Sequence, residues 1–261
     1  MNIIVLVKQV PDTTEIKIDK VTNTLIHTGV KNIINPDDLA GIEVALTLKE
    51  TYGGSVTTVT MGPPHAENMI TTLYARGVDN AYLLTDRKFA GSDTWATSKI
   101  LSTFIKTLDY DLVIAGYQAI DGDTAQVGPE IAEFLHIPHV PYVKKIIEVK
   151  EKSIVVVSGY DLYDEKVEVN YPCLITVEKD SYVPRLPSFR RKESFLEYRI
   201  PMMTLKDLED QDPEHYGLSG SPTQVEEIFP PNKSLESEMV EGNGKTLSKK
   251  IFEILKESRY V

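Results

Sequence analysis

Short apolar runs without strict alternation recur along the first two thirds of this chain and predict β-strands. A run with no polar face suits a strand that is covered on both sides, as in a parallel sheet. Segments with apolar residues at helical spacing lie between several of these runs. The predicted strands are residues 3–7, 56–61, 81–84, 112–115, 154–157 and 173–177.

Amphipathic segments predict helices over residues 35–52, 65–76, 93–108 and 246–258. At the start of the first, Asn35 is expected to cap the helix, Pro36 fits its first turn, and Asp37 and Asp38 complement the helix dipole. The alternation of strands and helices predicts an α/β fold with a doubly wound, mostly parallel sheet. In such a sheet the ligand binds at the carboxyl ends of the strands.

The pattern changes near Val183, where strand-like runs stop and proline and polar residues dominate. We expect residues 1–183 to form the α/β domain and residues 184–261 to form an extended C-terminal arm. Arg185, Arg190, Arg191 and Lys192 surround Phe189, a basic cluster in an acidic chain. That cluster favours a docking role for the arm, with a disordered tail as the alternative.

The segment LVIAGYQAIDGDTAQVGPEIAEFL, residues 112–135, indicates a strand, a glycine-containing loop and a helix. This arrangement holds phosphates through backbone N–H groups. The loop matches neither GxGxxG nor GxxxxGK[ST], so its spacing selects neither a dinucleotide nor a triphosphate. Asp121 and Asp123 would repel a pyrophosphate; contacts to ribose hydroxyls or loop N–H groups suit them better, and a cation site is the competing interpretation.

Distinctive residues follow the ends of the predicted strands and are expected to meet at one edge of the sheet. Each segment alone is weak, since Gly62-Pro63 is usually a turn and Asn35 usually a helix cap. Together they raise the odds of a nucleotide cleft. The segments are residues 8–12, 35–38, 61–63 and 116–127.

Composition narrows the class of protein. A net charge of −11 argues against a nucleic-acid or anionic membrane partner. Cys173 is the only cysteine, which excludes an internal disulfide and a cysteine-ligated cluster within the chain. The five histidines show no metal spacing, and no catalytic acid or base can be nominated. No apolar segment approaches the length of a membrane span, so a cytoplasmic protein is expected.

Five motifs resemble one known family, the β subunit of electron transfer flavoproteins. They are VKQVPD at 7–12, NPDD at 35–38, MGP at 61–63, GYQAIDGDTAQVGPEIAE at 116–133 and PRLPSF at 184–189. The resemblance implies a Rossmann-like, adenine-nucleotide-binding domain and a heterodimer with an α subunit, which the arm would embrace. It also implies flavin-based electron transfer with a dehydrogenase.

The resemblance distinguishes two types of β subunit. In the respiratory type the β subunit holds AMP as a structural element. Here Gly122 and the run at 124–129 look like the electron-bifurcating type of anaerobes, which holds a second FAD instead. The segment GSPTQV at 220–225 resembles the same group.

Residues that match the family motifs are the expected cofactor contacts. They are Leu6, Lys8, Asn35, Pro36, Asp37, Asp38, Met61, Gly62, Asp93, Thr94, Gly116, Tyr117, Gln118, Ala119, Ile120, Asp121, Gly122, Asp123, Thr124, Ala125, Gln126 and Val127. Phe189 aligns with the apolar anchor that enters a partner dehydrogenase, a position that is Leu in other members. Arg185 and Arg190 would steer that docking.

The implied function is hydride exchange between NAD(H) and an FAD in this chain, with electrons divided between ferredoxin and the FAD of the α subunit. A partner such as an acyl-CoA or lactate dehydrogenase would receive the electrons from the α subunit, and reverse flow is equally compatible. The first rival is the AMP-binding carrier. The second is an ATP-dependent enzyme of the same layered fold, which usually has a Ser-Gly-Gly loop after the first strand, whereas residues 8–11 contain no glycine.

Overall fold

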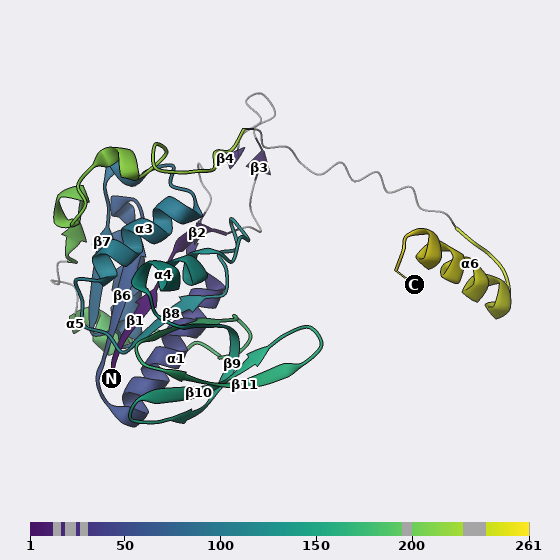
Figure 1. The fold of residues 1–261 in the computed structure, drawn as a ribbon, viewed down its shortest axis with the longest axis horizontal. Coiled ribbons are helices and arrows are strands. Elements are labelled where there is room, and N and C mark those ends of the chain that lie inside the picture. The colour runs from purple at the N-terminus through teal and green to yellow at the C-terminus, as the bar shows by residue number, and fades with distance from the viewer. Residues whose placement is uncertain (13–16, 19–24, 27–30, 195–199, 227–238, 261) are drawn as a thin grey trace. The chain divides into compact units, whose positions relative to one another are not determined.

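The structure is a computed structural model that describes residues 1–12, 17–18, 25–26, 31–194, 200–226 and 239–260. The chain divides into two compact units, Met1–Glu226 and Glu227–Val261. The first unit contains a nine-stranded sheet in the order β11-β10-β9-β12-β8-β1-β6-β7-β13 (Figure 1).

The strands of the large sheet are β1 (Asn2–Leu6), β6 (Ser55–Met61), β7 (Asn80–Leu84), β8 (Leu112–Gly116), β9 (His139–Val149), β10 (Ser153–Gly159), β11 (Asp164–Asn170), β12 (Cys173–Val177) and β13 (Met202–Met203). Two small antiparallel pairs lie outside it: β2 (Gln9–Pro11) with β5 (Asn32–Ile34), and β3 (Lys17–Ile18) with β4 (Leu25–Ile26). All six predicted strands are present, within one or two residues at each end.

The helices are α1 (Pro36–Tyr52), α2 (Glu67–Arg76), α3 (Thr94–Ile105), α4 (Val127–Leu135), α5 (Phe189–Ser194) and α6 (Gly244–Glu257). Single 3-10 turns, named η2 to η5, lie at Pro64–Ala66, Arg87–Phe89, Leu205–Asp207 and Pro213–His215. The four predicted helices are confirmed, with shifts of one to three residues at their ends.

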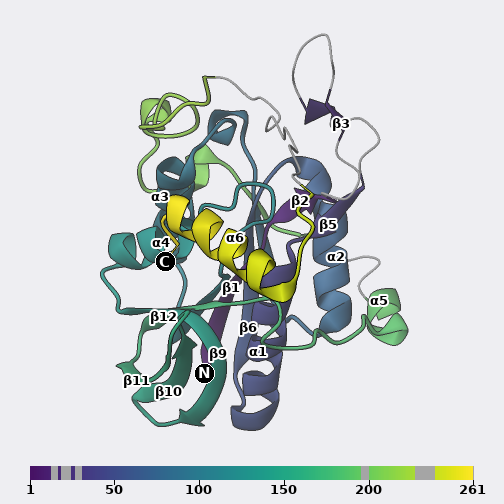
Figure 2. The same cartoon turned by 90° about the vertical axis from the view of Figure 1, so that its right-hand side faces the viewer.

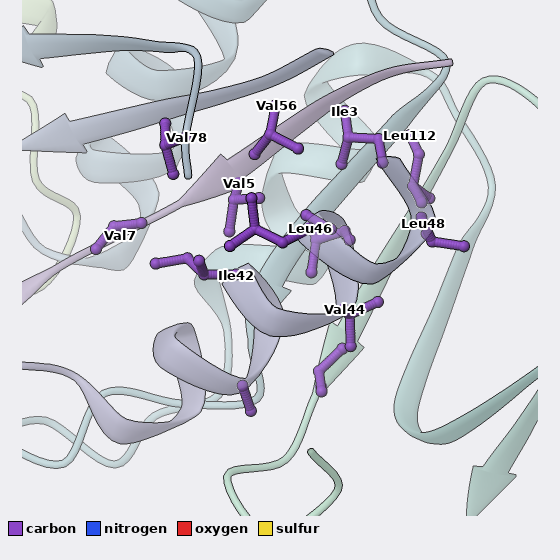
Figure 3. Close-up of a cluster of buried hydrophobic side chains, with 14 of the residues drawn as sticks. Ile3, Val5, Val7, Ile42, Val44, Leu46, Leu48, Val56, Val78 and Leu112 are labelled. Atoms are coloured by element: carbon purple, nitrogen blue, oxygen red, sulfur yellow. The ribbon is translucent and has the colours of Figure 1, made fainter. Parts of the chain in front are cut away.

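Helices cover both faces of the sheet, and each face has its own core. Figure 2 shows α1 and α2 on one side of the central strands and α3 and α4 on the other. Alternation along β1 divides its side chains between the faces: Ile3 and Val5 join the core under α1 and α2, whereas Ile4 and Leu6 join the core under α3 and α4. Figure 3 shows the first core, where side chains of β1 and α1 point toward one another.

This arrangement confirms the predicted doubly wound, mostly parallel α/β fold. β1 pairs in parallel with β6 on one side and with β8 on the other. The chain first builds the sheet outward through β6 and β7 and then returns to the opposite side of β1. The carboxyl ends of β1 and β8 therefore form the topological switch point at which ligands bind in such folds.

One of the six predicted strands is antiparallel to its neighbours. The run at 154–157 lies in β10, which pairs antiparallel with both β9 and β11. An apolar run reports burial on both faces and does not report the direction of the neighbouring strands. β9 and β11 were not predicted because charged, exposed positions interrupt their apolar residues.

The predicted arm contains more regular structure than its sequence indicates. β13 pairs in parallel with β7 and becomes an edge strand of the sheet. The predicted domain boundary after residue 183 thus falls inside the first unit, which continues to Glu226. The second unit contains α6, an amphipathic helix whose first turn is capped by Asn243 and in which no side chain is buried.

Candidate functional site

A cavity of about 340 Å3 opens at the carboxyl ends of β1, β6 and β8. Its size lies at the lower end of the range for small-molecule pockets. Its walls also include the loop after β8 and the starts of α3 and α4. The predicted residues that line it are Leu6, Lys8, Asn35, Asp38, Met61, Asp93, Thr94, Gly116, Tyr117, Gln118, Ala119, Gly122, Thr124, Ala125, Gln126 and Val127.

Asp38 links the two strands that form the switch point. Its Oδ2 accepts a hydrogen bond from the N–H of Lys8 at 2.7 Å, and its Oδ1 accepts from the N–H of Gly116 at 3.2 Å. The side chain of Asn35 also donates to Oδ1, at 3.0 Å. Burial raises the pKa of Asp38 to about 7, against the opposing effect of these hydrogen bonds.

Asn35 shapes the loop after β8 rather than capping α1. It stands at the N-cap position, but its side chain makes no capping bond, so the predicted cap is wrong. Its Nδ2 donates to the carbonyl of Gln118 at 2.7 Å, and its Oδ1 accepts from the N–H of Ile120 at 3.2 Å. The buried side-chain amide of Asn35 therefore hydrogen-bonds two backbone groups of one loop, and this fixes the loop to the start of α1.

Gly116 is required by close packing inside the protein. A Cβ at this position would lie 2.2 Å from Oδ1 of Asp38 and 2.8 Å from Cβ of Asp37. Gly122 differs, since a Cβ there would have no heavy atom within 4 Å. The two loop glycines therefore serve different purposes: Gly116 lets α1 approach β8, and Gly122 leaves space open on the side of the cavity.

Asp121 forms an ion pair with Lys8, whose Nζ lies 2.8 Å from both carboxylate oxygens. This pairing was not among the roles expected for Asp121. Further along the loop, Asp123 and Ala125 have φ values of 49° and 55°. Left-handed backbone at residues other than glycine is uncommon and clusters at functional sites.

The start of α3 forms the opposite wall of the cavity. Asp93 caps the helix by accepting from the N–H of Ala96 at 3.0 Å. The hydroxyl of Thr94 donates to Oε1 of Gln126 at 3.0 Å and also lies 3.1 Å from Oε1 of Glu130. Burial alone would raise the pKa of Asp93, but its hydrogen bonds outweigh that effect and lower it.

Tyr117 lines the cavity, and its ring packs against the ring of Tyr142. Their centroids lie 5.0 Å apart in an edge-to-face arrangement. Tyr142 has a left-handed backbone, with φ of 54°, and its N–H donates to the hydroxyl of Thr176. Tyr142 thereby connects β12 to a residue that lines the cavity.

The chain shows clear similarity to known proteins. Residues 22–197 match the electron transfer flavoprotein domain family. The electron transfer flavoprotein subunit beta of Thermoanaerobacterium thermosaccharolyticum is 47% identical over 262 residues, covering 100% of both chains. The chain belongs to the electron transfer flavoprotein β-subunit family.

Two further relatives in this family carry other names. The caffeyl-CoA reductase-Etf complex subunit CarD of Acetobacterium woodii is 47% identical over 93% of this chain and 92% of its own length. Protein FixA of Azorhizobium caulinodans is 40% identical over 90% of this chain and 86% of its own length. β subunits of electron transfer flavoproteins pair with an α subunit, and the family is associated with flavin and nucleotide.

Six of the predicted contacts do not line the cavity of this family member: Pro36, Asp37, Gly62, Ile120, Asp121 and Asp123. Asp37 accepts instead from the N–H of Lys179 at 2.9 Å, and burial raises its pKa. Seven lining residues were not predicted: Val7, Val59, Ser92, Thr97, Leu101, Ala115 and Gly128. Helical spacing from Asp93 could have found Thr97 and Leu101, and strand alternation from Met61 could have found Val59.

The predicted docking segment of this electron transfer flavoprotein β subunit lies on α1 and α2. Phe189 is 76% exposed. Arg185 forms ion pairs with Glu43 and Glu50 of α1, and Ser188 donates its N–H to the carbonyl of Ala75 at 2.8 Å. Two carboxylates already neutralise Arg185, so this residue attaches the docking segment to the domain. The positive charge of the docking segment then comes from the exposed basic residues of α5.

Within the described part of the chain, no group of three or more His, Cys, Asp or Glu side chains could hold a metal ion. Over the same residues, no helix combines the length and the apolar character needed to cross a lipid bilayer.

Proposed function

We propose that this chain binds FAD, with the AMP portion in the cavity and the isoalloxazine outside it, facing the α subunit and NAD(H). The observation that carries the proposal is the cavity at the switch point, lined by a phosphate-type loop that leads into α4. In this role the protein supplies binding and orientation, and the redox chemistry belongs to the cofactor.

The lining residues fit an adenine nucleotide. Leu6, Val59 and Leu101 provide an apolar surface for a base. The first turn of α4 offers N–H groups that have no partner within the helix, and such groups bind phosphate oxygens. Asp38 lies nearby, but three hydrogen-bond donors already occupy its oxygens, which limits its repulsion of a phosphate.

When bound, FAD would accept a hydride from NADH and release its two electrons singly, one to ferredoxin and one to the FAD of the α subunit. Loop residues 116–126 would hold the ribose and phosphates, and the ion pair of Lys8 with Asp121 would keep the rim of the cavity electrically balanced. The opposite direction of flow uses the same arrangement. The CarD relative is named as a subunit of a caffeyl-CoA reductase complex, which supports a partner that acts on acyl-CoA compounds.

The docking partner is proposed to be an FAD-dependent dehydrogenase, such as an acyl-CoA or lactate dehydrogenase, that binds around Phe189 and Arg190. An exposed aromatic side chain within a basic rim is a suitable centre for a transient interface. Residues 184–261 would form the docking and α-subunit-embracing arm, in which the apolar side of α6 is suited to a partner. A cytoplasmic location agrees with partners of this kind.

Nucleotide extraction from the purified heterodimer tests the proposal. We expect two FAD molecules per heterodimer and no AMP. One FAD together with AMP would instead support the carrier type, in which this chain holds a structural nucleotide. Anaerobic titration with NADH, with and without ferredoxin, then tests the redox role, since the carrier type would not be reduced by NADH.

A further inference from the structure

The arm does not leave the sheet after β13 but follows the edge of the domain toward the cavity. The N–H of Thr85, just after β7, donates to the carbonyl of Met203 at 2.8 Å. Next, the N–H of Leu205 donates to Oδ2 of Asp86 at 3.1 Å. Successive arm residues therefore accompany the chain from the end of β7 toward the loop that precedes α3.

Residues 217–221 pack tightly against that loop. A Cβ at Gly217, which has a φ of 60°, would lie 2.2 Å from the carbonyl oxygen of Lys88. A Cβ at Gly91, with a φ of 77°, would lie 3.3 Å from Cβ of Leu218. Glycine at both positions allows the two backbones to approach closely.

Beyond these glycines, the arm bonds directly to Asp93. The N–H of Asp93 donates to Oγ of Ser221 at 2.9 Å, and Ser221 is itself buried. The carboxylate of Asp93 accepts from both the N–H and the hydroxyl of Thr223, at 2.9 and 2.7 Å. The other carboxylate oxygen caps α3 through Ala96, so one side chain joins the arm to the first turn of the helix.

We propose that Ser221 and Thr223 are positioning residues for the nucleotide and that they couple the arm to occupancy of the cavity. This inference rests on the proposed nucleotide site. Asp93, Thr94 and Thr97 line the cavity, whereas Ser221 and Thr223 are not lining residues and are connected to it through their bonds to Asp93. The three donors hold the carboxylate of Asp93 at the first turn of α3 and partly compensate its negative charge next to the cavity.

Coupling between two sites is reciprocal in free energy. If the arm holds Asp93 in the binding geometry, a bound nucleotide in turn stabilises the arm on the domain. The stretch after Thr223 leads into residues 227–261, the second unit of the chain. A partner that moves the arm would therefore change the affinity for the nucleotide.

Nucleotide affinity of the full chain in its heterodimer tests the inference, with FAD and AMP as probes after removal of bound nucleotide. Thr223→Val removes one hydrogen bond to a carboxylate and is expected to weaken binding roughly tenfold, which corresponds to about 1.4 kcal/mol. Thr223→Ser keeps the hydroxyl and should restore the affinity. Thr51→Val is the matched control, because the Thr51 hydroxyl bonds a carbonyl within α1, away from the cavity.

Hydrogen exchange on the unmodified heterodimer provides a second measurement that needs no variant. Added nucleotide should slow exchange over residues 217–226. The inference would be overturned if Thr223→Val bound nucleotide as tightly as the wild type, or if added nucleotide did not change the exchange rate of residues 217–226. Either result would leave the proposed nucleotide site intact. A wild-type protein that binds neither FAD nor AMP would instead overturn the proposed function itself.

Discussion

The N–H of Gly116 donates a hydrogen bond of 3.2 Å to the carboxylate of Asp38, and this contact joins the end of β8 to the start of α1. The same carboxylate holds the N–H of Lys8 just beyond β1. The cavity thus rests on a buried acidic group that connects the two strands of the switch point. The hydrogen bond between Gly116 and Asp38 requires that residue 116 has no side chain.

Gly116→Ala is expected to destabilise the fold by about 1–3 kcal/mol, as overpacking of a tight site does. The new Cβ would meet Oδ1 of Asp38 at 2.2 Å, so the start of α1 must shift. Urea denaturation measures the change. Gly122→Ala lies in the same loop, faces open space and should leave the free energy of unfolding nearly unaltered. Equal effects from both substitutions would contradict this explanation of Gly116.

The titration of Asp38 predicts a pH dependence of stability. Its folded pKa of about 7 is well above its ordinary value of 3.8, so the folded protein retains a proton that the unfolded chain releases. The contribution of Asp38 to the free energy of unfolding is therefore largest near pH 4 and falls as the pH rises to about 7. In Asp38→Asn this trend should disappear.

Urea denaturation of wild type and Asp38→Asn between pH 4 and pH 7 tests this expectation. The free energy of unfolding of the wild type, measured relative to that of Asp38→Asn, should fall as the pH rises. Asp164→Asn is the control, because Asp164 is an exposed residue of β11 paired with Lys144. A difference between wild type and Asp38→Asn that does not vary with pH would exclude a raised pKa at Asp38.

Arg185→Lys is expected to loosen the docking segment without removing its charge. The guanidinium binds Glu43 and Glu50 together, and a lysine ammonium cannot reproduce that forked geometry. Hydrogen exchange at the Ser188 amide, which donates to Ala75, should become at least about threefold faster through local opening. The matched control is Arg190→Lys, on the exposed α5, and unaltered exchange in Arg185→Lys would assign Arg185 another role.

The sequence predicted the sheet well where burial alone determines the pattern. Cys173–Val177 is buried throughout and was found with its observed bounds. β11 was missed because exposed charged side chains occupy most of its positions. It is a strand because it pairs with β10, a relationship that its own sequence pattern does not reveal.

The cavity was predictable to the extent that its residues follow strands. Met61 and Gly116 lie at strand ends, where the fold class places ligands. Asn35 was misassigned because a cap signal and a tertiary hydrogen bond use the same side chain. The contacts of Ser221 and Thr223 with Asp93 join residues about 130 positions apart, a relationship that local pattern does not encode.

Phe189→Ala is expected to separate docking from folding. The side chain is 76% exposed, so its removal should alter the free energy of unfolding by less than about 0.5 kcal/mol. If Phe189 anchors the dehydrogenase, the second-order rate of electron exchange should fall by about tenfold or more, as for a central interface residue. Stopped-flow reduction of an acyl-CoA dehydrogenase by the reduced heterodimer measures that rate.

Leu162→Ala removes an equally apolar side chain, 94% exposed between β10 and β11, and should leave the rate unchanged. If both variants transfer electrons as fast as the wild type, the partner docks elsewhere, and the exposed basic residues of α5 must serve another contact.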